Sequence, residues 1–472
     1  MSVQTDLLQM AASLRSELGD DYHDKLMEAI YTDAASIVDS SVTRDAQKAH
    51  LTFDRALDRI LTHPIGGFIA MAFMFFIVFW LTITGANLPS SMLADLLLVR
   101  VYDVLHEIAA AQYAPSWISG FLIDGVYLAT AWVISVMLPP MAIFFPLFTL
   151  LEDFGYLPRV AFNLDRLFAK AGAHGKQSLS MMMGFGCNAA GVIATRIIDS
   201  PRERLIAIIT NNFSICNGRW PTLILMGTIF IGATAPPALA SFVAALSVVA
   251  IAGLGILMTL IVSWSLSHTW LKGEASVYSL ELPPYRPPQV MQTLYTSIID
   301  RTLIVLWRAV MMAAPAGALI WLTSNIMIGD ASIAGHMVDL LNPAGALLGL
   351  NGVILVAYIL AIPANEIIIP TILMLTLTLG SNVAGAQSGV MLELGDTQVY
   401  NVLTSIGGWT LLTAINLMLF SLLHNPCSTT ILTIWNETKN LRWTVVATVL
   451  PIVMGVVVTF SVATTARLLG LV

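Results

Sequence analysis

Three cysteines and one glutamate are the residues most able to do chemistry, because each interrupts an otherwise apolar segment. Cys187 follows a glycine-rich run, Cys216 and Cys427 lie in two polar interruptions, and Glu366 follows a proline-containing one. An asparagine lies close to each in the sequence: Asn188, Asn217, Asn365 and Asn425. Thiolates favour transition metals such as Fe²⁺, Zn²⁺ or Cu⁺ over Mg²⁺ or Ca²⁺. With a carboxylate and unwound backbone carbonyls, these residues predict a metal site for a borderline divalent ion.

Packing is the alternative for each cysteine, since a free cysteine in a membrane helix is usually a small apolar packing residue. Chance explains poorly why all three fall in interruptions. Glu366 is the stronger candidate, because ionisable residues within membrane segments are costly and commonly functional. Arg219 has three open roles: repelling cations, pairing with Glu366, or capping a half-helix. Met181-Met182-Met183 could serve as soft ligands, but packing is favoured.

The composition predicts that these residues lie in an all-α polytopic membrane protein. The chain has 472 residues, of which 57% are hydrophobic and 11% charged, and its mean hydropathy is +0.80. A soluble domain carries about 25% charged residues, so many surfaces must face membrane lipids. Three cysteines without regular spacing do not form a disulfide framework. No basic patch indicates nucleic acid as a partner.

The distribution of Lys and Arg predicts the first half of the topology by the positive-inside rule. A first span at about 66–85 leads to an external stretch, and a long apolar segment at about 120–151 returns to the inside. The apolar stretch 180–191 has basic residues on both sides, so it predicts a re-entrant hairpin. A broken span at about 205–231 and a span at about 240–264 follow.

The second half repeats this plan with opposite orientation. A span at about 303–327 leads outward. The apolar stretch 353–379 has acids but no Lys or Arg in both flanks, 329–342 and 380–400, so both flanks are external and a second re-entrant hairpin is predicted. A broken span at about 403–435 and a final span at about 445–468 complete the chain. Two inverted repeats, each with a re-entrant hairpin and a broken transmembrane helix, are typical of secondary transporters.

This organisation predicts five parts. They are a cytosolic helical segment at 1–62, a first span with its external stretch at 63–118, a first repeat at 119–270, a cytosolic loop at 271–302 and a second repeat at 303–472.

Two other signals are absent from the sequence. The segment Gly172–Ser178 contains a Gly-Lys pair but lacks the spacing of a phosphate-binding P-loop. The eight histidines show no H-x-x-x-H spacing, so no histidine-based zinc site is predicted. We therefore expect no GTP site in this chain and no enzymatic activity.

The interruptions also carry a family resemblance. The motifs concerned are Leu57–Pro64, Gly184–Asn188, Cys216 followed by Arg219-Trp220-Pro221, Glu281–Arg286, Pro363–Glu366 and Asn425–Thr430. They resemble the membrane region of the ferrous iron transport protein B (FeoB) family over roughly residues 50–470. The resemblance implies two Gate-type halves, similar to the plan of concentrative nucleoside transporters. It also implies Fe²⁺ as the transported ion, iron coordination by Cys187, Cys216 and Cys427, and a multi-pass protein of the bacterial inner membrane.

One departure from the family concerns the GTP-binding domain. The family normally begins with a GTP-binding domain, whereas a polar helical segment precedes the first span here. Two expectations stand side by side: a separately encoded G protein or small cytosolic accessory protein docks on residues 1–62, or transport proceeds without GTP. Assembly into a homo-oligomer is left open.

Two other functions compete with a ferrous-ion permease. A transporter of organic solutes, such as nucleosides, would need aromatic stacking and several neutral hydrogen-bonding groups, but has no need of three thiols. A membrane sensor would bind a ligand without moving it. Metal-dependent uptake into proteoliposomes separates the three.

Overall fold

The computed structural model describes residues 22–41, 56–63, 65–273, 285, 289–380 and 396–470. The chain divides into two units, residues 1–60 with 276–281, and residues 61–275 with 282–472. In the first unit, helix α2 (Tyr22–Ser41) agrees with the predicted helical segment. The rest of residues 1–55 and most of the predicted Glu281–Arg286 loop lie outside the described residues.

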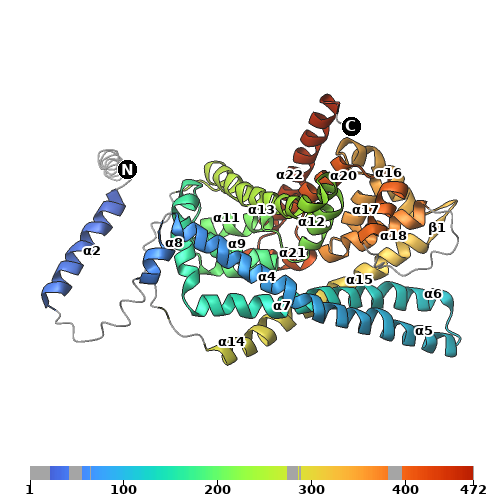
Figure 1. Ribbon diagram of the computed structural model, residues 1–472, viewed down its shortest axis with the longest axis horizontal. Coiled ribbons are helices and arrows are strands. Elements are labelled where there is room, and N and C mark those ends of the chain that lie inside the picture. Colours follow the sequence, from blue (N-terminus) through green and yellow to red (C-terminus); the bar gives the residue numbers. More distant parts are fainter. Residues whose placement is uncertain are drawn as a thin grey trace, which may run out of the picture. The chain divides into compact units, whose positions relative to one another are not determined.

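The second unit begins with two long helical runs that pack against each other (Figure 1). The outgoing run consists of α4 (Gly66–Ala94), η1 (Asp95–Val101) and α5 (Tyr102–Ala111), 46 residues in all. The returning run of 38 residues consists of α6 (Ser116–Ser119), η2 (Gly120–Tyr127) and α7 (Leu128–Asp153). Helix α7 continues through Pro139, Pro140 and Pro146.

The helix that contains the predicted first span does not end near residue 85 but continues through most of the expected external stretch. At 1.5 Å per residue, the outgoing run is about 69 Å long, against about 30 Å for the hydrocarbon core of a bilayer. A run of this length can cross the bilayer and continue beyond it, and it ends only at Ala111. The membrane boundary near residue 85 stays a prediction.

The remainder of the unit shows the same order of elements twice, with α7 and α15 as the first element of each half. The first series is α7, the amphipathic α8 (Tyr156–Lys170), α9 (Gln177–Gly186), α10 (Asn188–Ala194), α11 (Pro201–Thr210), α12 (Trp220–Met226) and α13 (Pro237–His268). The second series is α15 (Ile304–Asn325), α16 (Ile333–Leu347), α17 (Gly352–Leu360), α18 (Ile368–Gly380), α20 (Leu411–Leu423), α21 (Ser428–Thr438) and α22 (Leu441–Leu468). The predicted all-α class is confirmed, while the two inverted repeats stay a prediction.

Shorter elements connect these helices. They are η3 (Thr195–Ile197), η4 (Asn211–Phe213), η5 (Gly227–Ile231), η6 (Gly232–Thr234), α14 (Val290–Thr296), η7 (Ser297–Leu303), η8 (Asn365–Ile367), α19 (Asp396–Asn401), η9 (Val402–Ile406), and the strands β1 (Met327–Ile328) and β2 (Ala331–Ser332). The two strands pair antiparallel, with Met327 opposite Ser332.

The stretch 329–342, predicted only as an external segment, contains β2 and most of α16. Ser332 caps this helix, because its hydroxyl accepts a hydrogen bond from the Gly335 amide at 3.1 Å. Helices α16 and α17 then meet at a bend of 113°. Gly352 permits the bend, since a Cβ there would lie 2.3 Å from the Val338 carbonyl oxygen.

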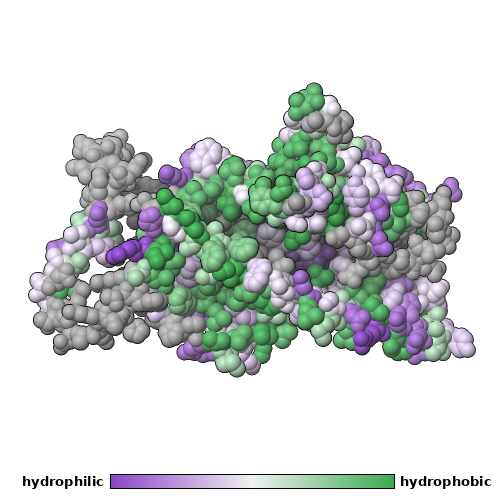
Figure 2. Space-filling model, viewed as in Figure 1, coloured by the Kyte–Doolittle hydropathy of each residue, from purple (hydrophilic) through white to green (hydrophobic). Residues whose placement is uncertain are grey.

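Burial separates the outer helices from the centre of the unit. In their most apolar windows, α13 and α22 are 17% and 22% buried, whereas the broken pair α20–α21 is 78% buried. The exposed side chains of the outer helices are themselves apolar, such as Phe242, Val249 and Val453, and hydrophobic residues cover much of the visible surface (Figure 2). Among the described residues, six helical segments are long and apolar enough to cross a membrane, or seven if the bent pair is counted as one span. The chain is a multi-pass membrane protein.

Candidate functional site

The first helix break lies at Cys187, between α9 and α10. Its backbone is extended, with φ −153° and ψ 122°. The two helices then fold onto each other, because a Cβ on Gly191 would lie only 2.8 Å from the Gly184 Cα. Residues seven apart in a continuous helix would be separated by about 10 Å, so the predicted hairpin bend is confirmed.

The second break separates η4 from α12 and contains Cys216 and Asn217. The Asn217 amide donates a hydrogen bond to the Gly186 carbonyl at 3.1 Å. The Asn211 side chain donates to the Asn188 carbonyl at 2.9 Å. The first two breaks are thus joined by their own backbone groups.

The third break lies between α17 and η8, and Glu366 follows it as the second residue of η8. The Glu366 carboxylate packs against Gly218 of the second break, where an added Cβ would lie 2.2 Å from Oε1. Cys216 lies close enough to interact electrostatically with Glu366 and with Cys427. Glu366 therefore faces the second break across the boundary between the two halves.

The fourth break, between α20 and α21, runs from His424 to Cys427. The Ser428 amide donates to the Ile362 carbonyl of the third break at 3.0 Å, and His424 Nε2 lies 3.1 Å from Asn365 Oδ1. Cys427 immediately precedes α21, and its sulfur lies 3.3 Å from Thr430 Oγ1. The N-terminal end of a helix stabilises negative charge, so this position suits a thiolate.

The structure therefore brings the four breaks together, and with them all eight predicted site residues. Cys187, Cys427, Glu366 and Asn217 are half-buried, whereas Cys216, Asn188, Asn365 and Asn425 are buried. Cys187 is also within electrostatic reach of the other two thiols. Within the part of the chain that the structure describes, no three His, Cys, Asp or Glu side chains are close enough to hold one metal ion. The ligands gather without closing around a single point, and metal binding stays a prediction.

The amide of Asn188 has a structural role in this arrangement. With its nitrogen oriented as a donor, it bonds the carbonyls of Gly184 at 3.0 Å and Ser214 at 3.1 Å. Its side chain thus holds the first two breaks together, and a ligand role for Asn188 stays a prediction.

Two residues at the breaks were not predicted as site residues. His424 is buried and reaches from the fourth break to Asn365 of the third, and Asn212 donates to the His424 carbonyl at 2.8 Å. Of the three open roles of Arg219, the geometry supports capping, because its guanidinium donates to carbonyls near the ends of two half-helices. No ion pair with Glu366 is present among the described residues.

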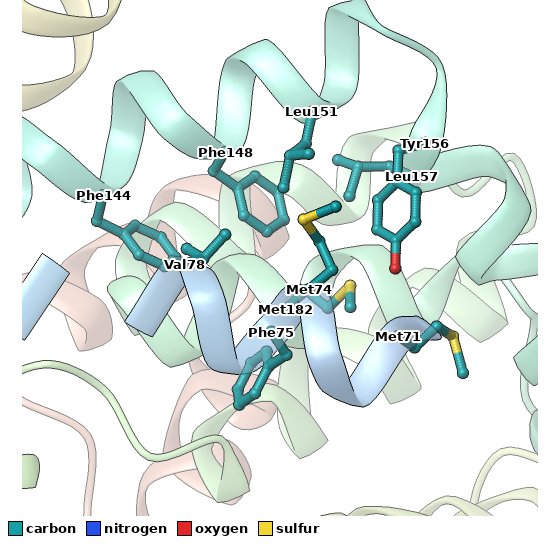
Figure 3. A pocket seen from close by; sticks show the side chains of 10 residues that line it. All are labelled: Met71, Met74, Phe75, Val78, Phe144, Phe148, Leu151, Tyr156, Leu157 and Met182. Atoms are coloured by element: carbon teal, nitrogen blue, oxygen red, sulfur yellow. The ribbon is translucent and has the colours of Figure 1, made fainter. Parts of the chain in front are cut away.

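The methionines beside the first hairpin pack in an apolar wall. A cavity of about 20 Å³ lies between α4, α7, α8 and α9 (Figure 3), lined by Met71, Met74, Phe75, Val78, Phe144, Phe148, Leu151, Tyr156, Leu157 and Met182. Phe75 and Phe185 meet edge to face at 5.2 Å. This wall fixes the hairpin against the first two long helices.

Comparison with known proteins gives two family matches. A family model described as "Nucleoside recognition" (Gate) matches residues 134–230 and 306–441, and one described as "Ferrous iron transport protein B C terminus" matches residues 248–300. No solved structure matches.

Several curated relatives carry the name Fe(2+) transporter FeoB. The protein of Staphylococcus aureus strain MSSA476 is 29% identical over 86% of this chain and 58% of its own length. That of Synechocystis is 29% identical over 85% and 61%, and that of Salmonella typhimurium 30% identical over 70% and 40%. The chain thus spans less than two thirds of these relatives. The family matches and the relatives together identify the chain as a membrane region of the ferrous iron transport protein B family.

Proposed function

We propose that this chain transports Fe²⁺ across a bacterial inner membrane through the four converging helix breaks. The relatives named Fe(2+) transporters support the substrate. The observation that carries the proposal is the approach of the Glu366 carboxylate to Gly218, beside Cys216, across the boundary between the two halves. A site shared by two halves can open to one side and then to the other.

The donor set suits an ion of borderline softness. The Glu366 carboxylate offers charge and oxygen, and the thiols of Cys187, Cys216 and Cys427 discriminate against Mg²⁺ and Ca²⁺. A thiol binds metal as the thiolate, so metal entry releases protons. Uptake is therefore expected to weaken as the medium becomes more acidic.

The open arrangement of the ligands fits transport better than storage. A closed tetrahedral site of four protein ligands is typical of structural zinc and holds its ion tightly. A site that must release its ion is expected to bind it with two or three groups at a time, aided by carbonyls of the unwound backbone. No three of these groups among the described residues meet at one point in this conformation, so a third would have to approach as the halves move. The ion would exchange partners as the halves move.

The N-terminal helix α2 is proposed as the docking element for a separately encoded G protein or a small cytosolic accessory protein. It exposes a set of apolar side chains: Leu26, Ile30, Tyr31, Ile37 and Val38. Exposed apolar side chains that form a patch commonly mark a site of protein–protein interaction. Deletion of residues 1–45 is expected to abolish stimulation by the partner; unchanged transport in its presence would count against a coupling role.

The test is Fe²⁺ uptake by the purified chain in proteoliposomes. Single variants Cys187→Ser, Cys216→Ser, Cys427→Ser and Glu366→Gln are expected to lower uptake or change the preference among Fe²⁺, Mn²⁺, Co²⁺ and Zn²⁺. Glu152→Gln, at the end of α7 and away from the breaks, is the matched control. If all four variants transport like wild type with the same ion preference, these residues only pack.

The alternatives give different results in the same vesicles. Nucleoside uptake without metal uptake would support an organic-solute transporter, as the description of the Gate family model suggests. Metal binding without flux of either substrate would support a sensor.

A further inference from the structure

Arg219 is a buried cation whose two terminal nitrogens donate five hydrogen bonds. Its side chain is buried, and the residue is 1% exposed. Nη1 donates to the carbonyls of Asn212 at 2.9 Å and Leu422 at 3.0 Å. Nη2 donates to Asn212 Oδ1 at 3.1 Å and to the carbonyls of His424 and Asn425, both at 3.2 Å. Five oxygens therefore surround one positive charge.

Four of these oxygens are backbone carbonyls at or just beyond the C-terminal ends of two half-helices, and the fifth is the side-chain oxygen of Asn212. Asn212 lies in η4, which extends α11, and Leu422 lies in the last turn of α20, just before His424. The last carbonyls of a helix have no partner within the helix and carry partial negative charge. No carboxylate forms an ion pair with Arg219 among the described residues. The two helix ends are thus its counter-charge.

In transporters built from repeats with discontinuous helices, half-helix C-terminal ends and unwound carbonyls coordinate the coupling ion, such as Na⁺. We propose that the Arg219 guanidinium is a built-in cation that occupies this coupling-ion site between α11 and α20. The chain then has no vacancy for Na⁺ at this crossing, and its transport does not depend on Na⁺. The transport part of this inference rests on the proposed function; the cation site itself does not.

Removal of the guanidinium would uncover five oxygens that converge on one point. Hard monovalent cations take oxygen ligands of this kind, and free guanidinium has the shape and charge of the missing group. The wild-type protein cannot bind either at this point, because Arg219 fills it. We therefore expect that small cations can bind in the emptied site and restore the stability that the Arg219→Ala variant loses.

The first experiment measures the melting temperature of Arg219→Ala in detergent, with choline, Na⁺ or millimolar guanidinium. The variant is expected to melt well below wild type, to recover with guanidinium, and to recover in part with Na⁺. Urea is the neutral control of the same shape and should not restore it. Arg159→Ala, which removes another buried arginine that lies over the Tyr285 ring, controls for general effects of guanidinium.

If Arg219→Ala does not fold, Arg219→Lys and Arg219→Met separate charge from volume. Lysine keeps the cation and should preserve most of the stability, while methionine should not. Equal behaviour of these two variants, or equal rescue of Arg219→Ala by urea and guanidinium, would overturn the proposal.

The second experiment measures Fe²⁺ uptake with Na⁺ or choline in the medium. Wild type is expected to transport equally in both, and Arg219→Ala to become several-fold faster with Na⁺. Wild-type uptake that requires Na⁺ would overturn the inference. If wild type does not transport Fe²⁺ at all, the proposed function fails, and the melting experiments still decide the cation site.

Discussion

At the scale of single residues, Gly218 shows how closely the two halves meet. The Glu366 carboxylate occupies the space that any side chain at residue 218 would need. The position of the carboxylate thus depends on Gly218, which has no side chain. A substitution at Gly218 can therefore move the Glu366 carboxylate without removing its charge.

Gly218→Ala is expected to displace Glu366 and lower Fe²⁺ uptake about tenfold, the effect of roughly 1.4 kcal/mol of lost binding free energy. The cause is a Cβ that would lie 2.2 Å from Oε1. Uptake assays check this against Gly253→Ala, where a Cβ meets nothing within 4 Å. Equal uptake by the two variants would mean that the carboxylate position does not matter.

Sequence patterns found the residues that interrupt helices, because glycine, proline and asparagine within apolar runs are visible locally. They could not find His424 or Asn212 as part of the site. His424 meets Asn365, 59 residues earlier in the chain, and a search for closely spaced histidines cannot detect such a partner. The role of Arg219 was equally open, since its acceptors come from two distant helix ends.

At the scale of elements, the hairpin of α9 and α10 depends on backbone contact between Gly184 and Gly191. Gly191→Ala places a Cβ 2.8 Å from the Gly184 Cα, and neither backbone can move aside freely. The variant is expected to lose about 1–3 kcal/mol of stability, measured by unfolding in detergent. Gly253→Ala again serves as the control, and a similar result for both would show that the hairpin can relax.

A buried carboxylate connects elements of the two halves on another side of the unit. Glu437, in α21, accepts hydrogen bonds from Arg204 Nη2 at 2.7 Å and from Arg196 Nη2 at 2.5 Å. Its side chain is 5% exposed, while that of Arg196 is 62% exposed. The start of α11 and the segment after α10 are thus tied to the end of α21.

Glu437→Gln is expected to cost about 1–2 kcal/mol, less than a fully buried pair because both arginines retain access to water. Thermal unfolding in detergent measures the loss of stability. The difference between variant and wild type should be smaller at high salt, because salt weakens the ion pairs of the wild type. Asp199→Asn breaks the pair between Lys176 and an aspartate that is 88% exposed, and should have no measurable effect. Comparable losses of stability in the two variants would contradict a stabilising role for the contacts of Glu437 with Arg196 and Arg204.

The turn between α8 and α9 contains a histidine that should respond to acid. Burial lowers the pKa of His174, and Lys176 acts in the same direction, while Glu203, Asp165 and Asp199 oppose it. The unfolded chain then binds more protons than the folded one below about pH 6.5, so stability falls as the pH falls through that value. Melting temperatures on both sides of it should decline less steeply for His174→Asn; parallel curves would exclude this histidine.

Element boundaries were predictable where the sequence breaks a helix, and less so where it does not. The breaks near Cys187, Pro363 and His424 agree with the structure. The continuation of the helix beyond the first span was not predicted, because charged residues such as Asp95 are compatible with a helix that leaves the bilayer. The polarity of a segment indicates whether it faces lipid or water. Whether the helix continues is indicated only by the presence or absence of helix-breaking residues.

At the scale of the whole molecule, the all-α polytopic class was predictable from composition, whereas the inverted repeat stays a prediction because its test needs the membrane. The charge distribution places Lys272 inside and Asp330 outside. A membrane-impermeant thiol reagent should label Asp330→Cys from the external face and Lys272→Cys only from the cytosolic face, in a background without the native cysteines. Labelling of both from one face would exclude the inverted arrangement. The division into five parts stays a prediction in the same way.

The first long helical run has a mechanical consequence. Even at a tilt of about 40°, a run of 46 residues extends well beyond the hydrocarbon core, and its outer part is braced where the Tyr102 hydroxyl donates to Asp124 at 2.6 Å. The outgoing run and the returning run that braces it form one stiff rod, which packs against the hairpin at one end and acts as a lever. A small rotation near the hairpin would become a several-fold larger displacement at Tyr113, which is 94% exposed. A spin label there would amplify rearrangements at the breaks that are too small to detect where they originate.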